Sequence, residues 1–397
     1  MRYDTIVIGG GIVGLATVYT LLRNSPAPRV LILEKEQRVA AHQSSHNSGV
    51  IHSGIYYRPG TLKAEHCRRG YGLLLDFCRT HDVPHEICGK LIVATEEREV
   101  PLLAELQRRG EANGLGGLRW LSSAAIREME PHVVGMAGLH VPQTGIVDFR
   151  VVSERLRDEI ERLGGEIRIG EEVVGLRQRS DSVEVEAPLG TYVAGRVICC
   201  GGLHADRLAR IAGAQPPWRI IPFRGEYYML RPERRDLVRG LVYPVPDPAF
   251  PFLGVHFTRM LDGVVEAGPN AVLALKREGY RWADVSLLDM ADTLAWPGFR
   301  KLARHYWRAG FGEIHRSLSK KAFVRSLQRL VPEVREEDLE SGGAGVRAQA
   351  CDRQGRLLDD FVFWADRRIL HVGNAPSPAA TSVLAIGETI VDTLSRL

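Results

Sequence analysis

The stretch Thr5-Ile-Val-Ile-Gly-Gly-Gly-Ile-Val-Gly14 decides the fold of this chain. A short β-branched run is followed at once by three glycines in a Gly-x-Gly-x-x-Gly pattern, and then by a helical pattern of apolar residues. The next strand-like run, Val30–Leu33, ends at Glu34, about 20 residues further on. Strand, glycine turn, helix, second strand and terminal acid together predict a Rossmann-like βαβ unit with a dinucleotide site at its turn.

Each part of this pattern has a physical role. Gly9 permits a tight strand-to-helix turn, Gly11 lets backbone N–H groups approach a pyrophosphate, and Gly14 lets the helix pack close to the strand. The helix N-terminus supplies positive potential for the phosphates. Glu34 accepts hydrogen bonds from a ribose diol and would repel a 2′-phosphate. These four residues are therefore predicted to bind the cofactor.

Composition bounds the class of protein. The chain has 397 residues, 45% hydrophobic and 25% charged, which is typical of a soluble globular protein long enough for two packed domains. The net charge is +4, and the basic residues are interspersed with acids, so nucleic acid is not expected as a partner. Six cysteines without a Cys-x-x-Cys pair indicate free thiols in a reducing compartment.

Location also follows from the sequence. The first predicted strand begins at about Tyr3, which leaves no room for a targeting segment before it. No uncharged run approaches the length that spans a bilayer. We therefore expect a cytoplasmic protein, with any membrane contact peripheral on the cytoplasmic face of the inner membrane.

The order of predicted elements indicates a discontinuous domain. Residues 1–85, 145–215 and 340–397 carry strand and helix patterns typical of a nucleotide-binding sheet. Residues 86–144 and 216–339 hold short strands separated by Pro and Gly, together with two helical stretches. The predicted fold class is α/β: a Rossmann-like domain with an inserted α+β substrate domain that contains a mixed or antiparallel sheet.

Several motifs identify a family. A long polar loop reads His42-Gln-Ser-Ser-His-Asn-Ser-Gly-Val-Ile-His-Ser-Gly-Ile-Tyr-Tyr57. Others follow in order: Cys88-Gly-Lys-Leu-Ile-Val93, Thr144-Gly-Ile-Val-Asp148, Ile221-Pro-Phe-Arg-Gly-Glu226, Phe250-Pro-Phe-Leu-Gly-Val-His-Phe-Thr258, Gly268-Pro-Asn-Ala-Val-Leu273, Lys276-Arg-Glu-Gly-Tyr280, Ala344-Gly-Val-Arg-Ala-Gln349 and Asn374-Ala-Pro-Ser-Pro-Ala-Ala-Thr-Ser382. On these motifs the chain resembles the FAD-dependent L-2-hydroxyglutarate dehydrogenases/oxidases of the D-amino-acid oxidase-like flavoprotein superfamily.

The resemblance implies oxidation of L-2-hydroxyglutarate to 2-oxoglutarate. A hydride passes from substrate C2 to N5 of the flavin of bound FAD, and a base removes the hydroxyl proton. The electrons then pass to a quinone or to O₂. Such a reaction needs cationic clamps for two carboxylates and a base of near-neutral pKa.

The same resemblance implies further contacts with FAD. The long polar loop would pass along the pyrophosphate and ribityl chain, and the last helix would aim its N-terminus at flavin N1/O2. The residues implied are Ser44, Ser45, Asn47, Gly49, Val174, Gly201, Thr381 and Ser382. Thr381 and Ser382 are equally typical of plain helix N-caps.

Two histidines are candidates for the base, because imidazole titrates near the working pH. His52 lies in the polar loop and His256 in an alternating strand. A core histidine bonded to a backbone carbonyl is the alternative for each, and His52 is slightly favoured.

The candidates for carboxylate binding are arginines in glycine-flanked motifs, since guanidinium offers a planar fork. These are Arg224 and Arg347, with Tyr56, Tyr57, Thr258 and Asn270 as second choices. His42, His46 and His52 lie close in sequence, but their spacing matches no zinc pattern, so no metal is expected.

One helical segment, Trp296–Arg308, combines apolar residues at helical spacing with four basic residues. Such a segment is typical of a helix that lies on an anionic membrane and admits quinone. It is also typical, and more often, of a helix packed on the core with a solvated basic face.

Other functions stay open at this point. An amino-acid or amine oxidase of the same superfamily would share the fold, and a nicotinamide dehydrogenase would share the glycine turn. A non-catalytic dinucleotide-binding sensor is the alternative from another class. The electron acceptor, the oligomeric state and the mode of flavin attachment do not follow from the sequence.

Overall fold

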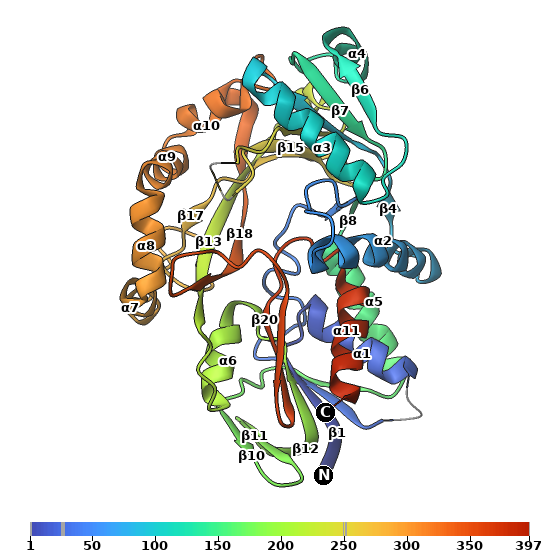
Figure 1. Cartoon of the computed structure of the whole chain (residues 1–397), viewed down its shortest axis with the longest axis vertical. Coiled ribbons are helices and arrows are strands. Elements are labelled where there is room, and N and C mark those ends of the chain that lie inside the picture. The colour runs from blue at the N-terminus through green and yellow to red at the C-terminus, as the bar shows by residue number, and fades with distance from the viewer. Residues whose placement is uncertain (1, 25–27, 249, 251, 397) are drawn as a thin grey trace.

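The computed structural model describes residues 2–24, 28–248, 250 and 252–396, and it contains two large sheets with helices outside them (Figure 1). The first sheet is built on β1 (Arg2–Ile8), which lies between β12 (Gly190–Cys199) and β2 (Val30–Leu33), all parallel. The other strands are β9 (Glu166–Arg168), β20 (Ile369–Asn374), β19 (Val362–Asp366), β10 (Gly175–Gln178) and β11 (Val183–Ala187). The parallel order β20-β12-β1-β2-β9 confirms the predicted Rossmann-like domain.

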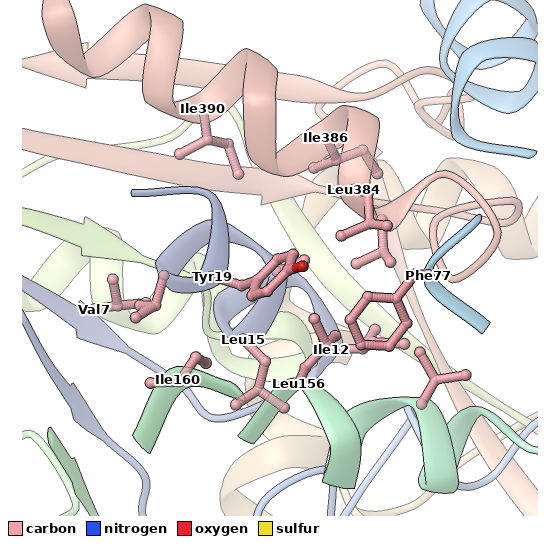
Figure 2. Close-up of a cluster of buried hydrophobic side chains, with 14 of the residues drawn as sticks. Val7, Ile12, Leu15, Tyr19, Phe77, Leu156, Ile160, Leu384, Ile386 and Ile390 are labelled. Atoms are coloured by element: carbon pink, nitrogen blue, oxygen red, sulfur yellow. The ribbon is translucent and has the colours of Figure 1, made fainter. Parts of the chain in front are cut away.

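Helices cover one face of this sheet. α1 (Ile12–Asn24) packs between α11 (Val383–Ser395) and α5 (Phe149–Arg162), and α2 (Leu62–Thr80) closes the layer (Figure 2). Leu15 of α1 and Ile386 of α11 are fully buried there, together with Val7 of β1. Full burial of each such side chain stabilises the fold by about 1.5–3 kcal/mol.

The opposite face of β1 is buried as well. Ile6 and Ile8 pack in a separate cluster with Leu208 of α6 (Ala205–Ile211) and with the β10–β11 hairpin. Because neither face of such a strand meets water, apolar residues occupy successive positions instead of alternating with polar ones. This explains the unbroken apolar run before the glycine turn.

The second sheet is mostly antiparallel and holds the inserted segments. Its strands are β17 (Val272–Leu273), β13 (Trp218–Leu230), β16 (Val265–Gly268), β15 (His256–Arg259), β14 (Leu241–Pro244), β5 (Lys90–Ala94), β7 (Ala137–Val141), β6 (Arg119–Ser122) and β18 (Leu339–Asp352). β18 corrects the predicted boundary at residue 340, because it pairs with β13 along its length instead of joining the first sheet.

A third, small sheet joins the two parts of the molecule. It consists of β3 (Val50–Ile51), β8 (Gly145–Val147) and β4 (His85–Glu86). β3 belongs to the long polar loop, so this pairing holds the loop in place beside both large sheets.

The remaining helices lie on the second sheet's side of the molecule (Figure 1). They are α3 (Val100–Ala112), α4 (Ser123–Met129), α7 (Leu287–Ala295), α8 (Pro297–His305), α9 (Trp307–Leu318) and α10 (Lys320–Leu327). The segment Trp296–Arg308 was expected to be one helix, and this expectation is wrong. Pro297 opens a new helix, since proline lacks an N–H but fits the first helical position, and the chain breaks again at Tyr306.

Candidate active site

One continuous cavity of about 820 Å³ is lined by both large sheets. Its walls include the glycine turn and Glu34 of the first sheet, and Tyr243 and His256 of the second. The volume lies at the upper end of the range for ligand pockets, about 300–1,000 Å³. The cavity is therefore large enough for an extended cofactor.

The glycine turn behaves as predicted. Gly9 has φ +108°, and a Cβ there would lie 2.5 Å from the Cys200 carbonyl oxygen. A Cβ on Gly14 would lie 2.1 Å from the carbonyl oxygen of Gly9, so α1 packs on β1 only because that side chain is missing. Gly11 lines the cavity instead, where a Cβ would meet only Ser44 Oγ at 3.5 Å. Gly9 and Gly14 thus serve packing, while Gly11 keeps the cavity open.

Glu34 directly follows the last residue of β2, and it lines the cavity. Its Oε2 accepts the N–H of Gly10 at 2.6 Å, and its Oε1 accepts the N–H of Glu36 at 2.9 Å. Both oxygens are acceptors held in place by backbone. This arrangement suits recognition of the ribose hydroxyls of a dinucleotide.

The polar loop docks on the N-terminus of α1. Ser44 Oγ accepts the N–H of Ile12 at 2.9 Å, and Ser44 and Asn47 both line the cavity. Ser45 and Gly49 do not line it. Ser45 donates its hydroxyl to the carbonyl of Ala40 within the loop, and a Cβ on Gly49 would lie 2.6 Å from the Val147 carbonyl oxygen. These two residues shape the loop instead of meeting the cavity.

The N-terminus of α11 corrects a further expectation. Ala379 and Ala380 line the cavity, whereas Thr381 and Ser382 do not. Thr381 Oγ1 accepts the N–H of His52 at 3.0 Å and so joins the helix to the polar loop. Ser382 holds the N-cap position, but its side chain makes no capping hydrogen bond. Plain N-capping therefore explains neither side chain.

Of the two remaining residues predicted to bind the cofactor, only Gly201 lines the cavity. Gly201 lies on the cavity wall, at the end of β12. Val174 is 63% exposed and does not line the cavity; its neighbour Val173 does.

Both candidate histidines line the same cavity. The Nδ1 of His256 lies 2.8 Å from the carbonyl oxygen of Gly254, which can only accept, so Nδ1 carries the proton and Nε2 keeps a lone pair. Burial lowers the pKa of His256 to about 3, against the effect of that hydrogen bond. Burial also holds the pKa of His52 well below its usual 6.5, and the charges of Lys90 and Lys63 add to this. Both imidazoles are therefore neutral near pH 7.

The two arginines predicted to bind carboxylates lie in different surroundings. In the β13–β18 pairing Arg224 lies opposite Val346, while Arg347 lies opposite Phe223. Successive side chains on a strand point to opposite faces, so the two guanidinium groups lie on opposite faces of the sheet. Arg347 lines the cavity. Arg224 does not, which corrects the expectation.

Arg224 has a structural environment of its own. It is fully buried, its Nη2 lies 2.8 Å from Glu226 Oε1, and its guanidinium lies 4.6 Å from the centre of the Trp282 ring. Asn270 belongs to the same cluster, since its Nδ2 donates to Glu226 Oε2 at 2.8 Å. Thr258 is also buried outside the cavity, with its hydroxyl 3.3 Å from that of Tyr243. Arg224, Asn270 and Thr258 therefore do not line this cavity.

Tyr56 and Tyr57 line the cavity as expected, and they are joined by residues that the sequence analysis did not propose as site residues. These are Tyr227, Tyr243 and Arg109. Tyr243 stacks on His256 with ring centres 3.8 Å apart. Strand alternation around the Tyr-Tyr and Val-Tyr-Pro runs could have indicated only the two tyrosines, and that signal is weak.

An ion-pair network lies on the wall near Glu34. Lys35 and His204 reach Glu278 at 2.7 and 2.9 Å, and His42 lies 2.9 Å from Glu36. Burial alone would raise the pKa of Glu278, but these hydrogen bonds hold it below its usual value. Glu36, His42 and Glu278 could offer three ligand atoms to a metal ion. Lys35 pairs with both carboxylates, so we interpret the group as an ion-pair network.

The comparison with protein families now decides the class. Residues 4–393 match the model of the FAD-dependent oxidoreductases. The chain belongs to that family. Membership of this FAD-dependent oxidoreductase family confirms the class of enzyme and the cofactor that the sequence motifs implied.

Three curated relatives of this oxidoreductase are L-2-hydroxyglutarate dehydrogenases by name. The L-2-hydroxyglutarate dehydrogenase of Indibacter alkaliphilus is 50% identical over 393 residues, which cover 99% of this chain and 98% of the relative. The enzyme of that name from Escherichia coli K12 is 45% identical over 100% of this chain and 94% of its own length. The human mitochondrial enzyme is 43% identical over 99% and 89%. The resemblance stated from the sequence is thus confirmed.

Solved structures show the same fold. The L-α-glycerophosphate oxidase of Mycoplasma pneumoniae with FAD bound superposes with a TM-score of 0.82 at 24% identity, over 100% of this oxidoreductase and 95% of that chain. The glycine oxidase of Geobacillus kaustophilus gives a TM-score of 0.73 at 19% identity, over 100% and 95%. Among the described residues, none of the helices is both long and apolar enough to cross a membrane.

The cavity fits FAD on its own evidence. Gly11 leaves open space at the N-terminus of α1, Glu34 offers two fixed acceptors, and the wall continues to the N-terminus of α11. These are the features that a dinucleotide needs.

We expect Gly11→Ala to weaken FAD binding without destabilising the apoprotein of this oxidoreductase. The added Cβ meets no backbone atom of the protein but enters the cavity. Crowding of this kind costs about 1–3 kcal/mol, which is roughly a 5- to 150-fold loss of affinity. The measurements are fluorescence titration of the apoprotein with FAD and thermal unfolding without FAD.

The matched control is Gly14→Ala. Its Cβ would meet the Gly9 carbonyl, so it should lower the melting temperature of the apoprotein itself. A Gly11→Ala protein that binds FAD as tightly as the wild type would contradict the assignment of the cradle.

Proposed function

We propose that the chain oxidises L-2-hydroxyglutarate to 2-oxoglutarate. The observation that carries the proposal is the meeting, in one cavity with the FAD cradle, of two neutral imidazoles and the guanidinium of Arg347. The names of the relatives give the same substrate. An imidazole base and a cation are what a 2-hydroxy acid requires for removal of its hydroxyl proton and for recognition of its carboxylate.

The residues divide the work. Arg347 binds a substrate carboxylate, and Tyr56 and Tyr57 border the same space. His52 takes the hydroxyl proton, because it is the more accessible of the two imidazoles and lies in the loop beside the FAD cradle. His256 donates no proton from Nε2, so it accepts a hydrogen bond and orients the substrate. Bound FAD supplies the acceptor for the hydride from C2.

The test of this function is anaerobic mixing of the holoenzyme with each enantiomer of 2-hydroxyglutarate. We expect the visible flavin absorbance to bleach rapidly with the L form and little with the D form, and the product to be 2-oxoglutarate. Equal rates for both enantiomers would contradict the assignment. Bleaching by amino acids, with release of ammonia, would favour the amino-acid oxidase alternative.

The pH dependence of the reaction should report the neutral base. The pKa of His52 is lowered by burial from its usual 6.5, so the unprotonated form persists below that pH and activity is lost only as pH falls further. We expect kcat, measured at saturating substrate, to be flat from pH 8 to 6.5 and to fall only at lower pH.

Replacement of the base tests the division of roles. His52→Asn should lower kcat by about 10²–10⁴-fold, the usual contribution of a general base. His256→Asn should mainly raise KM. A larger loss of kcat in His256→Asn than in His52→Asn would assign the base role to His256 instead. Retention of FAD absorbance by both variants controls for folding.

We also propose that the enzyme docks on an anionic membrane surface through α7 and α9, and that the electron acceptor is a membrane quinone in place of O₂. Trp307, Phe311, Ile314 and Leu318 form one stripe of α9, and each is at least 39% exposed. Leu287 and Leu288 of α7 are about 80% exposed. Apolar stripes on helices at the edge of the molecule (Figure 1) are typical of interfacial membrane contact.

Charge supports the same surface. From residue 285 to 325 the acids are Asp289, Asp292 and Glu313, all buried or half-buried and paired with arginines. The exposed basic residues of this segment are Arg300, Lys301, Arg304, Arg308, Lys321 and Arg325. Such a surface attracts an anionic bilayer.

Sedimentation with vesicles tests the docking surface. We expect the wild type to sediment with phosphatidylglycerol vesicles at low salt and to be released at high salt, because salt screens the basic residues. Phe311→Ser should weaken binding. Leu189→Ser is the matched control, since Leu189 is 78% exposed but lies in the β11–β12 turn. Failure of the wild type to bind at low salt would overturn the proposal.

A further inference from the structure

Lys90 is a buried cation for which the described residues provide no carboxylate. It stands at the start of β5 and is 1% exposed. Among the described residues, no carboxylate lies within 4 Å of its Nζ, whereas Lys35 and Lys63 on the cavity wall each pair with one. An unpaired buried ammonium costs several kcal/mol in general. A partner for this charge is therefore expected to come from outside the chain.

Lys90 does not itself line the cavity, but two aromatic rings that it contacts do. Its Nζ lies 4.2 Å from the centre of the Tyr243 ring and 5.0 Å from that of Tyr56, and both rings line the cavity. Tyr243 in turn stacks on His256. The Tyr56 hydroxyl is buried and has no hydrogen-bond partner among the described residues. A cation and a hydroxyl donor thus lie together without an acceptor.

The titratable neighbours do not supply an anion. Burial raises the pKa of the Cys67 thiol to about 12 and raises that of Cys88. Burial also raises the pKa values of Tyr56 and Tyr243 well above the usual 10. These four groups stay neutral at physiological pH, and the neighbouring histidines add no negative charge.

We propose that Lys90, together with the Tyr56 hydroxyl, binds the distal carboxylate of a five-carbon dicarboxylic substrate, while Arg347 binds the carboxylate next to the reacting carbon. Lys90 and Arg347 both lie close enough to His52 and His256 for their charges to lower the pKa of each imidazole. Lys90 lies on β5 of the second sheet, behind Tyr56 and Tyr243. The two cations match the two charges of a diacid. This inference rests on the proposed function and names the specificity determinant of its site.

The test compares Lys90→Met with the wild type on two substrates, L-2-hydroxyglutarate and L-2-hydroxypentanoate, which has the same chain length but lacks the distal carboxylate. We expect the variant to lose roughly 100-fold or more in kcat/KM on the diacid, the usual scale for a buried charge pair, and to keep its kcat/KM on the monoacid. An equal loss on both substrates would show a merely structural lysine and overturn the inference, as would no loss on either. Retention of FAD absorbance controls for folding.

A second measurement uses only the wild-type holoenzyme. Burial lowers the pKa of Lys90 to about 7, so an anion bound beside it should draw a proton from solvent at pH 8. Calorimetric titration with glutarate, in two buffers of different ionisation enthalpy, should show proton uptake that pentanoate does not cause. Equal uptake with both ligands, or none with glutarate, would overturn the inference. A wild type without preference for the diacid would instead remove the proposed function.

Discussion

The close approach of α1 to β1 is the contact on which the rest of the site depends. The missing side chain at Gly14 lets the helix backbone come against the carbonyl of Gly9, and this aims the helix N-terminus into the cavity. α1 is then the central helix of its layer, with α11 on one side and α5 on the other. Since Thr381 at the start of α11 binds the backbone of His52, the packing of α1 also places a candidate catalytic residue.

Burial produces the chemistry of the site from ordinary side chains. Removal of water disfavours charge on both histidines, so they become neutral acceptors without any special partner. The same removal of water makes the unpaired ammonium of Lys90 unfavourable until an anion arrives. One physical cause thus accounts for both the proposed base and the proposed binding determinant.

The comparison of Arg224 with Arg347 shows where sequence reasoning stops. Both lie in glycine-flanked motifs, and both suit a carboxylate equally well by residue type. The register of β13 with β18 puts them on opposite faces of one sheet, so only Arg347 meets the cavity. The pairing register of two strands that lie far apart in the sequence cannot be inferred from the local motif of either one. Lys90 was not predicted as a site residue, because nothing in Cys88-Gly-Lys-Leu-Ile-Val93 distinguishes a buried lysine from a surface one.

By itself, the sequence determined the Rossmann-like turn, the cofactor class and the family. Those depend on residues near one another along the chain, where each glycine and the acid at the end of β2 have a local steric or hydrogen-bonding reason. Only the tertiary structure decided which polar side chains meet in the cavity and that β18 belongs to the second sheet. These outcomes depend on strand pairing and packing between segments hundreds of residues apart, for which local residue patterns carry no signal.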